Sequence, residues 1–278
     1  MDTLKRKIVA DSSSDLIAFD AADFAAAPLK IITSEKEYVD DAALDVAGMV
    51  NDMLTYNGRS STSCPNTQDW LDAFGDADEV FCITITSNLS GAYNAAVTAK
   101  EAYETAHPGR KVCVIDSLST GPEMVLVIEK IAEMLKGGLS YDEIEKKARH
   151  YLKYTGLLFM LESMANLANN GRVSPVVAKV AGLLGIRVVG KASDHGTLEQ
   201  LNKCRGESRA LDAIVNHLKE LGFVGGKIRI DHCLNLKAAQ ELKARIVKQF
   251  EKAMVTIHEC RGLCSFYAEK GGLLVGFE

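Results

Sequence analysis

The first 121 residues of the chain repeat one pattern three times: an apolar run ends in a cluster of serines and threonines, and a helical pattern follows. The clusters occupy residues 11–15, 86–91 and 116–121, directly after the apolar runs 7–10, 80–85 and 111–115. Strands that alternate with helices are typical of α/β proteins, and a parallel sheet brings the carboxyl ends of its strands to one edge. We therefore expect these clusters to meet at that edge.

A fourth cluster, residues 60–65, precedes a short helix expected over 67–74. Hydroxyls and free backbone N–H groups at helix N-termini can bind an anion without a formal positive charge. None of the four clusters contains a His or Lys that could activate a nucleophile. The pattern therefore indicates a site that binds an anionic group rather than one that transforms it.

Composition limits the classes of protein that fit. The net charge of −5, with no dense Lys/Arg run, argues against a nucleic-acid binder. The charged start of the chain does not resemble a signal peptide, and no apolar stretch has membrane-spanning length. Seven scattered cysteines fit a reducing compartment better than a disulfide framework. We expect a cytoplasmic protein.

At 278 residues the chain is long enough for two domains. The pattern predicts two α/β domains, 1–154 and 155–278, the first with a mostly parallel sheet and with the ligand site between them. Strands are expected near 6–10, 29–33, 79–85, 111–115, 156–161, 186–190, 227–231, 254–260 and 273–277. Helices are expected near 42–56, 67–74, 90–106, 121–136, 141–154, 162–169, 174–184, 206–221 and 235–250.

Several short motifs follow one another in an order that resembles the bacterial DegV family. The matching segments are 11–16 (DSSSDL), 62–65 (TSCP), 89–93 (LSGAY), 116–117 (DS), 170–174 (NGRVS) and 203–206 (KCRG). The resemblance implies a two-domain α/β protein that encloses one long-chain fatty acid as its ligand, without a cofactor or metal. Several members of the family are the acyl-binding subunit of a bacterial fatty acid kinase. The resemblance thus implies a lipid-binding protein rather than an enzyme, with the catalytic kinase subunit as partner and transient contact with a membrane surface.

Motif matching assigns the fatty acid carboxylate to the hydroxyls of Thr62 and Ser90, with Ser63 beside them. The Gly91 N–H, at the start of the helix near 90–106, adds a donor and the positive end of the helix dipole. The alternative interpretation is that Ser90 is only a helix N-cap and Thr62 only a turn residue.

The chain departs from the family near its end. Members have a His-x-Gly-Pro-Gly element before the last strand, whereas this chain has YAEKGG at 267–272, which places Tyr267 at the histidine position. A tyrosine hydroxyl can donate to a carboxylate but carries no positive charge at neutral pH. Arg172, in a turn after a helix, is expected either to contact the headgroup or the kinase, or to cap helix carbonyls. Residues 176–190 either line the acyl tunnel or pack between helices.

Other constellations are less favoured. His258, Cys260 and Cys264 form a zinc-like trio, but the first two fall on an apparent core strand, where alternation alone places them on one face. Asp11 and Asp15 could bind Mg²⁺, yet Asp between a strand and a helix is ordinary capping.

The second class of function is an enzyme of phosphate or acyl-transfer chemistry in the same crevice. Cys64 could be its nucleophile, but no nearby sequence identifies a His partner. The missing base favours fatty acid binding.

Overall fold

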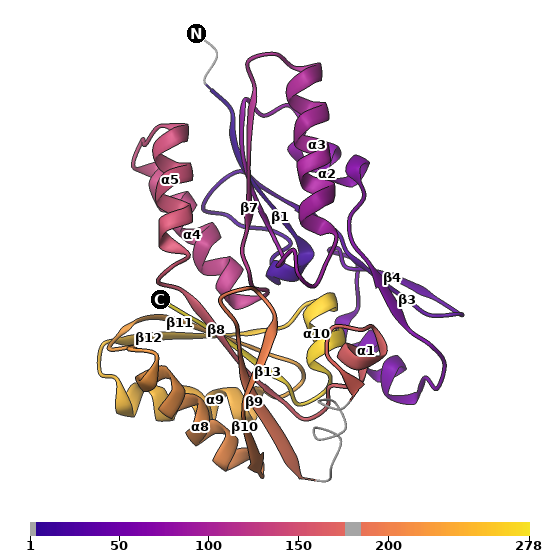
Figure 1. The fold of residues 1–278 in the computed structure, drawn as a ribbon, viewed down its shortest axis with the longest axis vertical. Coiled ribbons are helices and arrows are strands. Elements are labelled where there is room, and N and C mark those ends of the chain that lie inside the picture. Colours follow the sequence, from indigo (N-terminus) through magenta and orange to yellow (C-terminus); the bar gives the residue numbers. More distant parts are fainter. Residues whose placement is uncertain (1–3, 176–184) are drawn as a thin grey trace.

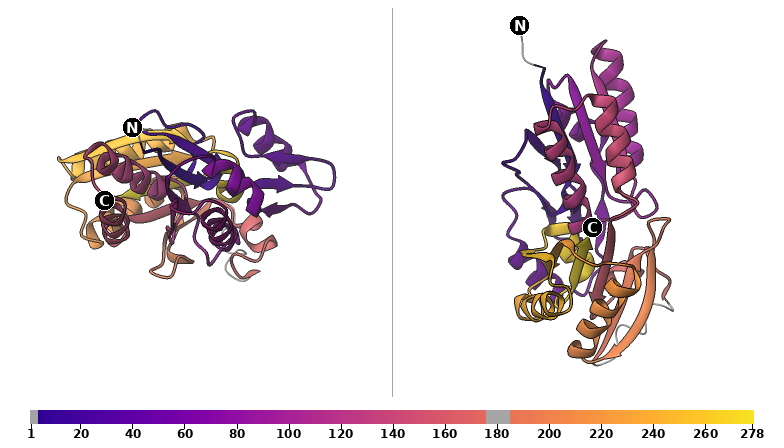
Figure 2. Two further views of the ribbon diagram at one scale, coloured as in Figure 1. Left: turned by 90° about the horizontal axis from the view of Figure 1, so that it is seen from above. Right: turned by 90° about the vertical axis from the view of Figure 1, so that its left-hand side faces the viewer.

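The chain forms two α/β units that lie one above the other along the long axis of the molecule (Figures 1 and 2). The computed structural model describes residues 4–175 and 185–278. Within these residues the strands form three sheets, in the orders β2-β1-β6-β7, β4-β3-β5 and β10-β9-β8-β13-β11-β12. The first two sheets belong to the N-terminal half and the third to the C-terminal half. The expected α/β class is confirmed.

The first unit is built on an all-parallel sheet, as the strand–turn–helix pattern predicts. Its strands are β1 (Arg6–Asp11), β2 (Phe24–Ala27), β6 (Glu79–Thr84) and β7 (Lys111–Asp116). Its helices are α2 (Thr67–Phe74), α3 (Ala92–Ala106), α4 (Pro122–Lys136) and α5 (Tyr141–Tyr151). In Figure 1, α2 and α3 lie on one side of the sheet and α4 and α5 on the other. Both faces are thus covered, which explains why the strands are nearly continuous apolar runs.

A small antiparallel sheet projects from this unit. It consists of β3 (Lys30–Ile32), β4 (Glu37–Val39) and β5 (Ser61–Ser63), with α1 (Val46–Thr55) between the last two strands in sequence. Strand β5 pairs with β3, so that Thr62 lies opposite Ile31. Thr62 is therefore on a strand and not in a turn.

The second unit has a mainly antiparallel sheet, in which only β11 and β12 pair in parallel. Its strands are β8 (Gly156–Leu161), β9 (Ile186–Ala192), β10 (Leu198–Arg205), β11 (Gly226–His232), β12 (Ala253–Glu259) and β13 (Leu273–Phe277). Its helices are α6 (Ala165–Asn169), α8 (Glu207–Glu220), α9 (Leu236–Gln249) and α10 (Gly262–Ala268). The last strand of the chain, β13, lies inside the sheet between β8 and β11.

Helix α4 joins the two units, because it packs on the parallel sheet and also on β13. Its first two turns are buried on all sides. Gly276 of β13 permits this approach: a Cβ there would lie 2.6 Å from the carbonyl carbon of Pro122. The division expected at 154/155 falls between α5 and β8.

Several expectations were wrong in detail. The helix expected over 42–56 begins at Val46, because Asp45 caps it by accepting from Gly48 N at 2.9 Å. The helix expected over 162–169 is only Ala165–Asn169. Strands β2, β4, β5 and β10 and helix α10 were not expected, and all are short or polar. The helix expected over 174–184 lies outside the described residues, apart from its first two positions. Among the described residues, no helix is long and apolar enough to cross a membrane.

Candidate functional site

A cavity of about 310 Å³ lies between the two units, at the carboxyl edge of the parallel sheet. The loop after β6 contributes residues 85–86 and 89–91, and the loop after β7 contributes 118–120. These two Ser/Thr clusters meet at one edge, as the sequence pattern predicts. The cluster after β1 does not line the cavity, but Ser13 O accepts hydrogen bonds from Gly121 N and Thr120 Oγ1. The opposite wall comes from β8, the β9–β10 hairpin, α10 and β13.

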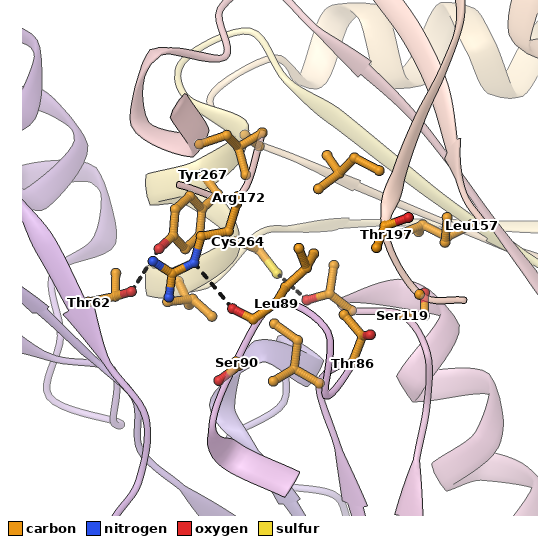
Figure 3. A pocket seen from close by; sticks show the side chains of 18 of the residues that line it. Thr62, Thr86, Leu89, Ser90, Ser119, Leu157, Arg172, Thr197, Cys264 and Tyr267 are labelled. Carbon is orange, nitrogen blue, oxygen red and sulfur yellow. Dashed lines mark hydrogen bonds between the residues drawn. The ribbon is translucent and has the colours of Figure 1, made fainter. Parts of the chain in front are cut away.

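The six residues expected at the ligand headgroup all line this cavity: Thr62, Ser63, Ser90, Gly91, Arg172 and Tyr267. Figure 3 shows Thr62, Arg172 and Tyr267 together at one end, and Thr197 and Leu157 at the other. The polar end therefore combines residues from β5, the β6–α3 loop, the segment after α6 and α10.

Thr62 and Tyr267 form a hydroxyl pair at the polar end. Thr62 Oγ1 lies 2.7 Å from the Tyr267 hydroxyl, and either oxygen can be the donor. Burial raises the pKa of Tyr267, although the Thr62 hydrogen bond and the Arg172 charge oppose this effect. Tyr267 is therefore a neutral phenol at physiological pH. One of the two hydroxyl hydrogens lies between the oxygens, so the other remains free for a ligand.

Ser90 and Gly91 begin helix α3. Ser90 Oγ accepts from Ala92 N at 3.2 Å, but the N-cap of α3 is Gly91, so the interpretation of Ser90 as only a helix N-cap is wrong. In the described part of the chain, no group accepts from the Ser90 hydroxyl hydrogen. Among the described residues, no group accepts from the Gly91 N–H, which lies at the positive end of the α3 dipole. A Cβ on Gly91 would lie 3.3 Å from Cys64 Sγ, so glycine lets the two loops approach closely.

Arg172 is the one charged side chain among the described residues that line the cavity. Its Nε donates to Leu89 O at 3.2 Å and its Nη1 donates to Asn170 O at 2.5 Å. The guanidinium carbon lies 5.9 Å from the centre of the Tyr267 ring. Arg172 thus caps carbonyls, and it also brings a positive charge to the polar end; its contact with a headgroup or a kinase stays a prediction.

The remainder of the cavity is mostly apolar, with four hydroxyl side chains among the aliphatic ones, Thr86, Ser119, Thr120 and Thr197. Its aliphatic and aromatic wall consists of Leu29, Ile85, Leu89, Leu118, Leu157, Phe159, Leu161, Leu167, Leu198, Leu263 and Leu274. The segment expected to line a tunnel, 176–190, does not contribute through its described part: residues 185–190 lie in or beside β9 and do not reach the cavity. Its other residues lie outside the described part of the chain. Ala192 and Leu198, from the same hairpin, line the cavity instead.

Groups that would support catalysis are scarce at the site. No His, Lys, Asp or Glu occurs among the described residues that line the cavity. Burial raises the pKa of Cys64, so that its thiol stays protonated and a weak nucleophile. No group of three or more His, Cys, Asp or Glu in the described chain could hold a metal ion. The expectation that His258 lies on a core strand is wrong, because β12 is an edge strand and the residue is exposed.

Comparison with known proteins identifies relatives of this chain. A family model described as "Uncharacterised protein, DegV family" matches residues 5–278. A DegV domain-containing protein of Streptococcus pneumoniae is 42% identical over 276 residues, which cover 98% of each chain.

Two solved structures are similar over nearly their full length. One is a DegV family protein from Eubacterium eligens loaded with heptadecanoic acid, with a TM-score of 0.96, 42% identity and coverage of 98% of this chain and 99% of that one. The other is the Fatty Acid Kinase (Fak) B3 protein of Streptococcus pneumoniae loaded with linoleic acid, with a TM-score of 0.97, 42% identity and coverage of 99% of both chains. The match of the family model over almost the whole sequence, on the fold described above, shows that this chain belongs to the DegV family.

Proposed function

We propose that this protein binds one long-chain fatty acid, with its carboxylate among Thr62, Ser90, Tyr267 and Arg172 and its acyl chain in the apolar cavity. The observation that carries the proposal is one cavity with a leucine-rich wall and an end where the Arg172 charge lies beside the hydroxyls of Thr62 and Tyr267. A fatty acid combines an apolar chain and a charged group in the same way, and ligand cavities are commonly apolar with a few placed polar groups. Relatives loaded with heptadecanoic and linoleic acid support the assignment.

Each polar residue has a separate role in this proposal. Ser90 Oγ and the Thr62–Tyr267 pair each offer one free hydroxyl hydrogen, and Gly91 offers its N–H. Arg172 supplies the positive charge that balances the carboxylate. Ser63, which also lines the polar end, is a further hydroxyl donor. Hydrogen bonds to a charged group contribute about 1.5–3 kcal/mol each, so these donors fix the direction in which the ligand lies.

We further propose that the protein presents this carboxylate to the catalytic subunit of a fatty acid kinase in the cytoplasm. The relative named Fatty Acid Kinase (Fak) B3 protein supports the first part. The free state of all seven cysteines supports the second, because cytoplasmic thiols stay reduced. Phosphate or acyl transfer by this chain itself has less support, since the described cavity wall offers no carboxylate, imidazole or amine as a base.

Protein purified from cells is expected to carry about one long-chain fatty acid per chain, because an apolar cavity gains stability when it is filled by an apolar chain. Denaturing extraction followed by mass spectrometry measures this ratio. If no acyl chain is extracted and the protein takes up neither added oleate nor added palmitate, the proposed function is wrong.

Thr62→Val and Tyr267→Phe are each expected to weaken oleate binding by about 1–2 kcal/mol, since each removes a hydroxyl and leaves its partner unpaired. The double variant should lose less than the sum of the two, because the second change removes a group that is already orphaned. Titration calorimetry on all four proteins measures the coupling. Additive losses would mean that the two hydroxyls bind the ligand independently.

A further inference from the structure

The first Ser/Thr cluster, residues 11–15, lies behind the cavity and is bonded to the loops that line it. Asp11 Oδ2 accepts from Ile85 N at 2.8 Å, which fixes the loop after β6. Ser13 O accepts from Gly121 N at 2.7 Å, after β7, and from Cys264 Sγ at 3.3 Å, on α10. This cluster therefore ties both units together without contacting the ligand cavity itself.

Two buried aspartates of the first unit hold the start of α10. Asp15 Oδ1 accepts from Arg261 N at 2.7 Å. Asp40 Oδ1 and Oδ2 accept from Gly262 N and Leu263 N, both at 2.9 Å. The first N–H groups of a helix have no partner within the helix, so these carboxyl groups complete its N-terminus. These hydrogen bonds therefore fix the N-terminus of α10 against the first unit.

The second oxygen of Asp15 faces Asp231 on β11. Both residues are buried, with 5% of Asp15 and 0% of Asp231 exposed. As two carboxylates, neither Oδ2 atom has a hydrogen-bond partner in the described part of the chain, because a carboxylate only accepts. A single proton between the two side chains turns this contact into a hydrogen bond. Arg229 Nε donates to Asp231 Oδ1 at 2.8 Å, which places the negative charge on Asp231 and the proton on Asp15.

We propose that Asp15 is a positioning residue for the headgroup site, which as a neutral acid donates a hydrogen bond to Asp231 and so holds α10, with Tyr267, against the cavity. The ligand part of this inference rests on the proposed function; the protonation part does not. Loss of the proton would place two carboxylates against each other across the boundary between the units and would displace α10 from Thr62.

The charges around the pair agree with this assignment. The pKa of Asp15 lies well above its usual value, first because of burial and then because of the charge of Asp231. Asp40 adds to this rise, while the Arg261 N–H and the Arg229 charge oppose it. Burial raises the pKa of Asp231 to about 6, and Arg229 opposes that rise. Asp15 therefore retains its proton to a higher pH than Asp231.

The remaining titratable neighbours are uncharged near neutral pH. Burial raises the pKa of the thiols of Cys233, Cys260 and Cys264, all of which lie in the field of Asp15. Partial desolvation and the Arg229 charge both lower the pKa of His258, the register partner of Asp231 on β12. None of these groups supplies a second positive charge that would ionise Asp15.

The native state thus holds a proton that the unfolded chain releases above the usual pKa of an aspartate, about 3.9. The stabilisation from Asp15 is complete below that value and decreases as the pH rises toward its raised native pKa. Asp15→Asn removes this dependence but keeps the contact, because the amide donates to Asp231 and its oxygen accepts from Arg261 N. Asparagine also tolerates the left-handed backbone of Asp15, with φ of 59°.

The first test compares thermal unfolding of lipid-free parent and Asp15→Asn at pH values above the pKa of Asp231, which is about 6, from roughly pH 6.5 to 8, so that Asp231 is largely ionised in both proteins. One extra proton in the native state changes the folding constant of the parent tenfold per pH unit. The melting temperature of the variant should therefore rise relative to that of the parent by about 3 °C for each pH unit. Burial raises the pKa of Asp11 to about 6, but Asp11 titrates in both proteins, so its effect cancels in the difference between their melting temperatures. Parallel profiles would show that native Asp15 is ionised and would overturn the proposal.

The second test measures oleate binding at pH 7 by delipidated parent, Asp15→Asn and Asp15→Ala. The Asn variant should keep the parent affinity within about twofold, whereas the Ala variant should lose about tenfold, because Arg261 N loses its acceptor. If the Ala variant does not fold, the affinity of the Asn variant still tests the positioning role of Asp15. Loss of affinity in Asp15→Asn, or parent affinity in a folded Asp15→Ala, would overturn the positioning role. If the parent binds no oleate, the proposed function fails, while the unfolding comparison still tests the pair.

Discussion

Arg172→Ala is expected to weaken oleate binding by about 2–3 kcal/mol, roughly 30- to 150-fold. Arg172 is the one charged side chain among the described cavity-lining residues, so its removal leaves the carboxylate without a counter-charge. A broken buried ion pair costs about 3–5 kcal/mol, and the half-buried position of Arg172 reduces that figure. Calorimetric titration of both proteins with oleate measures the loss.

The control ligand is oleyl alcohol, which has the same chain and no charge. Arg172→Ala should change its affinity little, because the lost contribution is electrostatic. Arg172→Lys keeps the charge but cannot reproduce the donation from Nε to Leu89 O, and it should fall between the parent and the alanine variant. An equal loss for oleate and oleyl alcohol would show that Arg172 acts through Leu89 and the shape of the loop.

The part of the site that lies on one parallel sheet could be predicted from sequence. The clusters after β6 and β7 follow long apolar strands and precede helices of 15 residues each, so both periodicities are clear. Parallel pairing of β6 with β7 then forces their carboxyl ends together. This pattern places the loop that contains Ser90 and Gly91 at the edge of the sheet, and the family resemblance singles out these two residues within it.

The rest of the polar end depends on pairing that no local pattern reveals. Thr62 lies on a three-residue strand of serine and threonine, which forms because Ile31 and its neighbours on β3 offer a partner. Tyr267 meets it across 205 residues of sequence, on a seven-residue helix that two distant aspartates cap. Only the motif resemblance indicated that Thr62 and Tyr267 belong to one site.

The acyl wall could not be predicted, because wall and core residues are chemically alike. Strand β8 reads GLLFML and is apolar on both faces. Leu157, Phe159 and Leu161 face the cavity, while Leu158 and Met160 pack in the core of the second unit. Alternation of side chains along the strand separates the two sets but does not indicate which face lines the cavity and which packs in the core.

Gly276→Ala is expected to lower the free energy of unfolding by about 2–3 kcal/mol. The added Cβ would lie 2.6 Å from the carbonyl carbon of Pro122 and 2.7 Å from Glu123 N, both backbone atoms of the first turn of α4. Because neither a strand inside the sheet nor a helix buried between two units can move freely, the overpacking cost is high. Urea or thermal unfolding measures it.

Gly137→Ala, at the other end of α4, is the matched control. Its φ is −73° and its added Cβ meets atoms no closer than 3.4 Å, so the change should stay within about 0.5 kcal/mol. The loss in Gly276→Ala should extend to the ligand, since residues 118–120 of the cavity wall lead directly into Pro122. A shift of α4 away from β13 would carry that wall outward and weaken oleate binding together with stability. Normal stability of Gly276→Ala would instead mean that α4 moves on β13 without cost, and that close contact at Gly276 is not what holds the two units together.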